Sequence, residues 1–114
     1  MGAGMKYPIM PFWVGDFLID TMELTDTAVG VYVKLLIHQW NNGTIPADVD
    51  RLALIAPAAP LMWEQLEKYF HPVKKQPGRL MNNRCQKEKE KTEHRSRVAK
   101  KNADARWNAD DKQD

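Results

Sequence analysis

The stretch LTDTAVGVYVKLLIHQWNNG, residues 24–43, carries the clearest structural signal in the chain. It opens with Thr25, a favourable N-cap residue, and Asp26 then places a negative charge near the positive end of the helix dipole. It closes with Asn-Asn-Gly, which is typical of a helix end. The sequence therefore predicts a helix from about Asp26 to Asn41.

This helix repeats large apolar residues at the spacing of one helix face. The residues are Val29, Val33, Leu36, Ile37 and Trp40. A chain of 114 residues, of which 43% are hydrophobic, can form one compact domain. We expect the repeated face to pack on its core.

Two shorter helices are predicted after the long one. Residues 44–46 can form a short extended piece, and Asp48 or Asp50 then caps a helix that the stretch APAAP, residues 56–60, interrupts. Pro60 suits the first turn of a third helix. Its apolar face consists of Met62, Trp63, Leu66, Tyr69 and Phe70. Two short helices separated by a tight break indicate a helix-turn-helix arrangement.

A short hairpin is predicted next, with strands at about residues 73–75 and 79–83. Between them, Gln76-Pro77-Gly78-Arg79 fits a type II turn, because Pro fixes its own φ and Gly accepts a positive φ. Three helices followed by a hairpin make a winged helix. We therefore predict a mainly α fold with a small β-hairpin, a winged helix-turn-helix extended by a basic C-terminal helix.

The chain divides into four predicted parts. Residues 1–10 are expected to form a flexible extension, residues 11–84 the winged-helix domain, residues 85–107 the basic helix and residues 108–114 a disordered tail. Inside the domain, residues 11–22 are too apolar to be left loose in water. We expect them to form an irregular segment with one or two helical turns.

The net charge of +2 conceals an uneven distribution. Residues 84–107 contain nine Lys and Arg against four Asp and Glu, whereas residues 1–83 contain seven against eight. Val98 and Trp107 are the only large apolar residues of this basic segment, so it lacks the seam that a coiled coil requires. It is predicted to dock partly on the domain and then to project or fray.

Catalysis and metal binding find little support in the sequence. His38, His71 and His94 are scattered, and Cys85 has no cysteine or histidine at metal-ligand spacing. Phosphate-cradling glycine loops and nucleophile motifs are also missing. We expect neither an enzyme nor a metal or cofactor site. A single cysteine and the lack of an apolar run of about 18 residues favour a cytoplasmic protein without a membrane span.

Nucleic acid is the first candidate ligand, because basic residues are present on the hairpin and along the C-terminal segment. Such residues contact phosphates and fix position without reading sequence. The alternative is an ordinary solvated surface. The candidate DNA-binding residues are Lys74, Lys75, Arg79, Arg84, Arg95, Arg97, Lys100, Lys101 and Arg106.

A protein partner is the second candidate. The outward residues of the third helix include Glu64, Gln65, Glu67 and Lys68, a net negative surface that phosphates would repel. We therefore assign partner binding to Glu64, Gln65 and Lys68 of this helix, together with the aromatic segment near the N-terminus. The partner could be a replication protein or a second copy of the chain, which would make a homo-oligomer. A dimer that does not shift DNA would favour this alternative.

The sequence also resembles the YdaU-like family of uncharacterised phage and prophage proteins. The resemblance covers about Pro11 to Trp107 and rests on PFWVGDFLIDTMELTDTAVGVYVKLLIHQWNNGTIP, DRLALIA, WEQLEKYF and AKKNADARW. It implies, by analogy with the winged helices of phage replication initiators, a role in phage or prophage DNA replication. Two positions depart from the family pattern. Ala28 stands where an acidic residue is common, and Asn82-Asn83 replaces residues of basic or histidine character.

Overall fold

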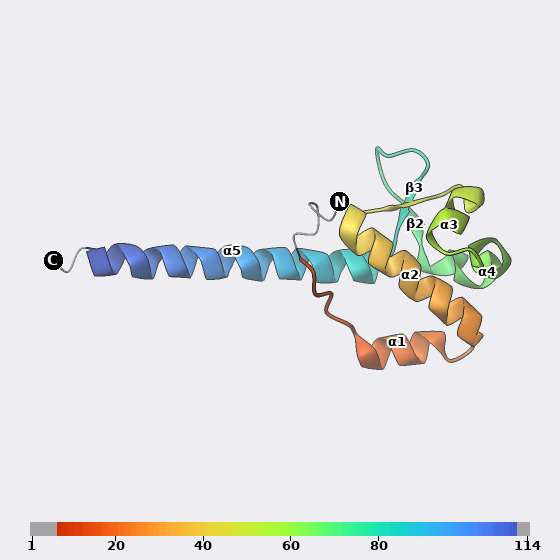
Figure 1. Cartoon of the computed structure of the whole chain (residues 1–114), viewed down its shortest axis with the longest axis horizontal. Helices are drawn as coiled ribbons and strands as arrows, with labels where there is room; N and C mark the ends of the chain where they lie inside the picture. Colours follow the sequence, from red (N-terminus) through yellow and green to blue (C-terminus); the bar gives the residue numbers. More distant parts are fainter. Residues whose placement is uncertain (1–6, 112–114) are drawn as a thin grey trace.

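The computed structural model describes residues 7–111 and shows a small helical body from which one long helix projects (Figure 1). The described residues form five α-helices, one 3-10 helix and a three-stranded antiparallel sheet. In chain order these are α1 (Val14–Thr21), α2 (Asp26–Asn42), β1 (Ile45–Pro46), α3 (Val49–Ile55), α4 (Ala59–Leu66), η1 (Glu67–Tyr69), β2 (His71–Pro72), β3 (Arg79–Met81) and α5 (Asn83–Asp111).

Helix α2 is the central element of the body, and its predicted ends are confirmed. The Thr25 side chain accepts a hydrogen bond from the Ala28 N–H at 3.2 Å, and Gly43 ends the helix with a φ of 91°. The predicted core face is partly wrong, because Ile37 is 46% exposed. The helix is rotated so that its buried face includes the small Ala28 and the polar Gln39. The buried residues are Ala28, Val31, Tyr32, Leu35, Leu36, Gln39 and Trp40.

Helices α3 and α4 pack on α2 as the two predicted short helices. The Asp48 side chain caps α3 by accepting a hydrogen bond from the Asp50 N–H at 2.9 Å. Pro60 lies in the first turn of α4, where a missing N–H costs nothing. Leu52, Leu66 and Phe70 are buried in the core between these helices and α2.

The sheet differs from the predicted hairpin in its strands. Strand β2 comes earlier than expected, at His71–Pro72, because the expected strand at residues 73–75 is part of the connecting loop. The predicted turn is present: the Arg79 N–H donates to the Gln76 carbonyl at 3.2 Å, and Gly78 has a φ of 76°. Strand β1 joins as a third strand, giving the order β1-β3-β2.

Helix α1 lies against the body through one face. Trp13 and Phe17 are buried, and the Phe17 ring stacks on Tyr32 of α2 with 5.4 Å between centroids. The Tyr69 hydroxyl donates to the Asp20 carbonyl at 2.6 Å. The expected segment with one or two helical turns is thus an eight-residue helix.

Helix α5 has 29 residues and a length of about 43 Å. Its first turns are docked, with Cys85 and Glu88 buried, whereas every side chain from His94 to Trp107 is exposed. We call residues 94–107 the distal part of α5. The helix begins before residue 85 and continues to Asp111, so its boundaries are wider than predicted, and residues 108–111 of the predicted disordered tail belong to it.

The N-terminal residues 7–10 also differ from the flexible extension that the sequence suggested. The Trp40 indole N–H donates to the Tyr7 carbonyl at 2.7 Å, and Met10 packs against the core. These contacts attach residues 7–10 to the body. The rest of the predicted extension, residues 1–6, and residues 112–114 of the predicted tail lie outside the described residues.

Candidate nucleic-acid interface

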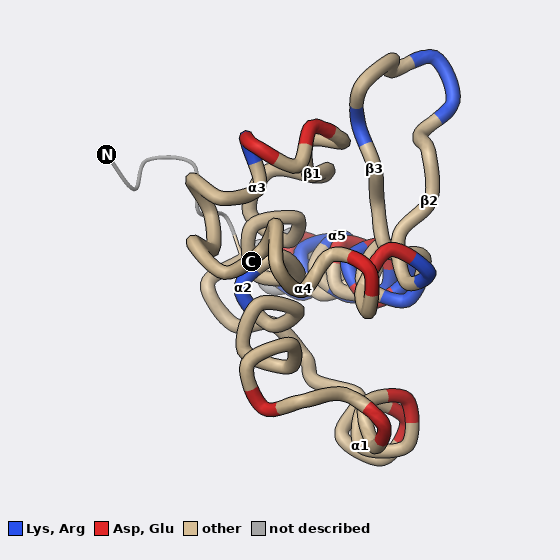
Figure 2. The backbone as a smooth tube through the Cα atoms, turned by 90° about the vertical axis from the view of Figure 1, so that its right-hand side faces the viewer, with Lys and Arg blue, Asp and Glu red and all other residues tan. Residues whose placement is uncertain are grey.

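The loop that joins β2 and β3, residues 73–78, carries two of the predicted DNA-binding residues. Lys74 and Lys75 are exposed in this hairpin loop, which stands clear of the body (Figure 2). Two successive turns shape it, since the Gln76 N–H donates to the Val73 carbonyl at 3.3 Å and Lys75 has a φ of 66°. Both ammonium groups are therefore presented to solvent on a turn that the backbone defines.

Arg79 is part of the hairpin but is turned back towards the body. Its Nε donates to the Thr44 Oγ1 at 2.8 Å, and a second guanidinium nitrogen donates to the Thr44 carbonyl at 3.4 Å. The side chain is half-buried. Arg79 thus connects β3 to Thr44, the residue before β1. Fewer of its N–H donors are left for a ligand than those of Lys74 and Lys75.

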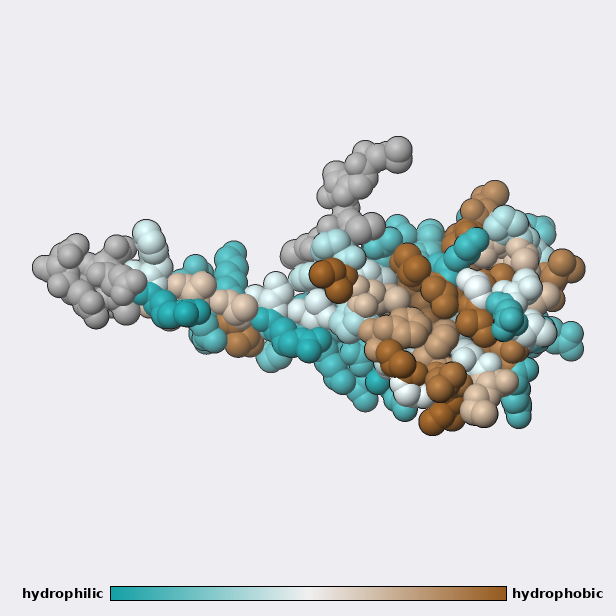
Figure 3. Space-filling view, turned by 60° about the horizontal axis from the view of Figure 1, so that its bottom comes forward, coloured by the Kyte–Doolittle hydropathy of each residue, from teal (hydrophilic) through white to brown (hydrophobic). Residues whose placement is uncertain are grey.

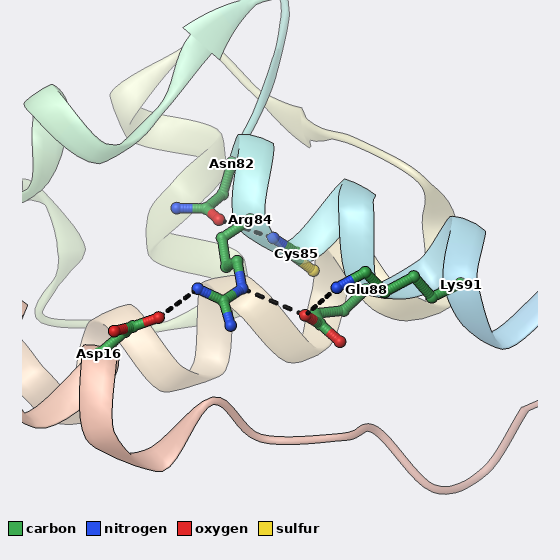
Figure 4. A network of polar contacts seen from close by, with 6 residues as sticks. All are labelled: Asp16, Asn82, Arg84, Cys85, Glu88 and Lys91. Atoms are coloured by element: carbon green, nitrogen blue, oxygen red, sulfur yellow. Dashed lines mark hydrogen bonds and ion pairs between the residues drawn. The ribbon is translucent and has the colours of Figure 1, made fainter.

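Arg84, another predicted DNA-binding residue, is held in a structural network (Figure 4). Its guanidinium donates to the Asp16 carboxylate at 2.5 Å and to the Glu88 carboxylate at 3.1 Å, and it lies over the Trp13 ring at 5.5 Å. The hydrogen bond to Asp16 in particular raises the pKa of Arg84. Two carboxylates on one guanidinium cancel its positive charge locally, so Arg84 joins α1 to α5 and is poorly placed for phosphate.

The distal part of α5 carries the other five predicted cations. Arg95, Arg97, Lys100, Lys101 and Arg106 are all exposed, and Asp104 is the one carboxylate among the 14 residues of this part. At 100° per residue, Arg97, Lys100 and Lys101 lie within an arc of about 100°, whereas Arg95 and Arg106 lie on the other side of the helix. The distal part is thus basic around its circumference.

These nine residues do not form one continuous surface. The hairpin loop rises from the body, and the distal part of α5 extends away from the body along another direction (Figure 1). Arg79 and Arg84, which would have linked the two, are engaged with Thr44 and with carboxylates. The structure therefore presents two separate basic surfaces, the loop and the distal helix.

The predicted partner-binding residues share one face of α4 and its continuation in η1. Glu64 and Lys68 are exposed and Gln65 is half-buried, with its Nε2 3.7 Å from the Met62 sulfur. Leu61 lies on the same face as these residues, because it precedes Glu64 by three positions and Gln65 by four, and it is 79% exposed. The face combines one apolar residue with a mixture of charges.

Asn82 has a structural role that the sequence analysis missed, since there it was named only as a departure from the family pattern. Its Oδ1 accepts from the Cys85 N–H at 2.9 Å and so caps α5, while its Nδ2 donates to the Tyr32 hydroxyl and to the Tyr69 carbonyl. Its backbone exchanges two hydrogen bonds with the Gln39 amide, at 3.0 and 2.7 Å. The available signal was an Asn one residue before a helix-forming run, which is a typical N-cap.

A shallow groove of about 460 Å³ lies between α2 and α3, lined by Lys34, Ile37, His38, Asn41, Leu54 and Ile55. Burial, and secondarily the nearby Arg79, lowers the pKa of His38. Among the side chains that the structure describes, no three of His, Cys, Asp or Glu lie close enough to hold a metal ion. None of the described helices is both long and apolar enough to cross a membrane.

Comparison with known proteins identifies the family. The family model described as "Protein of unknown function (DUF1376)" matches residues 7–90, which include the hairpin and the docked part of α5. The uncharacterized protein YdaU of Escherichia coli (strain K12) is 35% identical over 60 residues, which are 53% of this chain and 21% of YdaU. The match thus spans about a fifth of that relative's length. No solved structure matches the chain. Because the family model covers most of the chain, the protein belongs to the DUF1376 family of proteins of unknown function.

Proposed function

We propose that this domain is a winged helix that binds DNA through phosphate contacts with little sequence preference. The order α2-β1-α3-α4-β2-β3 supports the fold assignment, since it combines three helices with a terminal hairpin and a strand between the first two helices. In this assignment α3 and α4 are the helix-turn-helix and the hairpin loop is the wing.

The observation that carries the proposal is the distal part of α5, a cation-rich helix without any half-buried side chain. Arg97, Lys100 and Lys101 share one side of this helix, so they can contact three phosphates of the same duplex. Lys74 and Lys75 on the hairpin loop add a second point of contact, which brings the phosphates neutralised to about five.

The proposed binding fixes position and carries little sequence information. Helix α4 would be the reading helix of a winged helix, but its outer face and that of η1 contain Glu64 and Glu67 beside Lys68. A phosphate-lined groove repels such a face. The proposed setting is phage or prophage DNA replication, and it comes from the family resemblance alone.

Fluorescence anisotropy with a labelled duplex tests the proposal. For about five phosphates neutralised, the affinity should fall about 500-fold between 50 and 200 mM salt, because the logarithm of the affinity declines with a slope of roughly −0.9 per phosphate. Changing Arg97, Lys100 and Lys101 together to Ala should make the slope less negative by about 2.7, since three contacts are lost. Alanine preserves the helix, which circular dichroism verifies.

The matched control changes two exposed cations on the body, Lys34→Ala and Arg51→Ala, and should leave affinity and salt slope unchanged. Equal losses in the two variants would show general charge attraction and refute the assigned interface. Affinity that does not depend on salt would refute phosphate contact itself. A labelled single strand, measured in parallel, identifies the preferred form of DNA.

A second candidate function is a protein-interaction module that uses α4, with a replication protein or a second copy of the chain as partner. The exposed Leu61 beside Glu64, Gln65 and Lys68 favours it, because an apolar centre with a charged rim is typical of interface patches. A dimer in sizing chromatography that Leu61→Ser dissociates, together with no DNA binding, would support this function over the first.

A further inference from the structure

Trp107 is a large aromatic side chain that the fold leaves in solvent. It is 70% exposed near the end of α5, whereas Trp13 and Trp40 are buried in the body and Trp63 is half-buried. Leaving a ring of this size in water forgoes the free energy that its burial would contribute. Trp107 is therefore a candidate contact residue for a ligand.

Helical spacing places Trp107 on the same side of α5 as three of the distal cations. Trp107 follows Lys100 by seven residues, so the two lie within about 20° of each other around the helix and about 10 Å apart along it. Arg97 and Lys101 lie about 60° and 100° from Lys100 in the other direction. Together the four residues occupy an arc of about 120°, and we call them the basic-aromatic stripe.

The stripe is not part of an apolar face. Val98, which is 42% exposed, precedes Trp107 by nine residues and so lies on the opposite side of the helix. On the face that Figure 3 shows, hydrophobic residues are gathered on the body, and the projecting helix is mostly hydrophilic. A helix that lies on a membrane or in a protein groove needs a continuous apolar face, which the distal part of α5 lacks.

A ligand that matches the stripe combines phosphates with an uncovered aromatic face. In duplex DNA both faces of each base are covered by the neighbouring base pairs, and exposing one costs unstacking energy. In a single strand the bases are free to stack on aromatic side chains while Lys and Arg track the phosphates. The pairing of one exposed indole with three cations therefore favours a single strand.

We propose that the basic-aromatic stripe takes single-stranded DNA, with phosphates on Arg97, Lys100 and Lys101 and an unpaired base stacked on the Trp107 indole. This inference rests on the proposed DNA binding and names the form of DNA that the distal part of α5 recognises. Stacking adds affinity without reading the base, because every base has an aromatic face.

Asp104 is the one carboxylate on this side of the distal part. It follows Lys100 by four residues and precedes Trp107 by three. Its charge opposes phosphate binding, so the stripe keeps a net charge of +2 instead of +3. Asp104→Asn should therefore strengthen the binding of a single strand, and weaker binding by this variant would overturn the placement of phosphates on the stripe.

The test is fluorescence anisotropy of the full chain with a labelled single strand of about 15 thymidines and with a labelled duplex. Trp107→Ala should weaken the single strand at least about fivefold, leave the duplex unchanged and leave the salt slope unchanged, because stacking involves no charge. Trp107→Phe should keep most of the affinity. Trp107→Leu should lose as much as alanine, because it keeps apolar bulk without an aromatic face.

Two matched controls separate stacking from other effects. Val98→Ala, on the opposite side of the helix, should leave both affinities unchanged. A strand of equal length without bases keeps every phosphate and removes the stacking partner. It should bind the original chain as weakly as Trp107→Ala binds the normal strand, and Trp107→Ala should weaken it no further. Circular dichroism verifies that the variants remain helical.

Failure of this inference differs from failure of the proposed function. A chain that binds neither form of DNA would refute both. Salt-dependent binding of both forms, with no effect of Trp107→Ala on the single strand, would leave phosphate contact standing and overturn stacking. Equal losses on duplex and single strand would also overturn it. Anionic phospholipid vesicles that bind the original chain but not Trp107→Ala would overturn it in favour of a membrane surface.

Discussion

Replacing Asn82 by Ala should be the most destabilising single change in the polar contacts of this domain. Asn82 is buried where three elements meet: it follows β3, caps α5 and faces Tyr32 of α2. Its side chain makes three hydrogen bonds, to the Cys85 N–H at 2.9 Å, the Tyr32 hydroxyl at 3.0 Å and the Tyr69 carbonyl at 2.8 Å. Alanine can make none of them.

The magnitude follows from these three bonds. Loss of an N-cap side chain costs about 1 kcal/mol. The two hydrogen bonds donated by Nδ2 contribute about 1 kcal/mol each, and their loss leaves the buried Tyr32 oxygen and Tyr69 carbonyl without that donor. The free energy of unfolding should therefore fall by about 3 kcal/mol, a large share of the 5–15 kcal/mol that is usual for a domain. The midpoint of thermal unfolding should fall by roughly 12 °C.

Urea unfolding followed by tryptophan fluorescence measures this change, because Trp13 and Trp40 are buried in the folded state. The matched control is Asn83→Ala, the neighbouring and exposed first residue of α5, which should cost no more than about 0.5 kcal/mol. A loss below about 1 kcal/mol for Asn82→Ala, or equal losses at the two asparagines, would refute the reasoning. Gln39→Leu should also destabilise, since it leaves the Asn82 N–H without its acceptor.

Three further predictions concern other parts of the molecule. Burial raises the pKa of Cys85 to about 11, so a thiol-reactive dye should label it only as fast as the protein unfolds, and rapid labelling at pH 8 without denaturant would contradict this. The pKa of His38 is lowered in the folded state, so just below pH 6.5 the unfolded chain binds more protons than the folded chain. The free energy of unfolding should therefore fall as the pH drops through that region. Urea unfolding should show a smaller fall for His38→Gln than for the original chain. Ala103→Gly should lower the helical circular dichroism signal, because Gly costs about 1 kcal/mol of local helix stability. It should not move the urea midpoint followed by tryptophan fluorescence, because the distal part of α5 makes no contact with the core.

The sequence was most informative where local chemistry alone decides the structure. Thr25 and Asp48 cap their helices as expected, Gly43 ends α2, and Gly78 takes the positive φ of the predicted turn. Each of these depends on a few neighbouring atoms, and so the residue type is enough to predict it.

Prediction failed where distant contacts decide the structure. The face of α2 could not be fixed from large apolar residues, because Gln39 is buried through its hydrogen bonds with the distant Asn82, and the small Ala28 is buried in the core. Strand β2 begins at His71 and not at residue 73 as predicted, because pairing with β3 sets its position. A strand of two residues is too short for hydrophobic periodicity to locate it. The ion pair of Arg84 with Asp16 joins residues 68 positions apart. Because the sequence does not reveal this pair, Arg84 was counted as a free cation and was predicted to bind DNA.

The engagement of Arg84 decides where the proposed DNA contacts can lie. At the base of α5, Asp16 and Glu88 neutralise Arg84, Lys91 pairs with Glu88, and Lys89 donates to the Trp40 carbonyl. These contacts interrupt the basic surface between the hairpin loop and the distal part of α5. Sites that share no contacts usually act additively. Substitutions that remove charge from the loop and from the distal part are therefore expected to lower the proposed affinity for DNA by amounts that add.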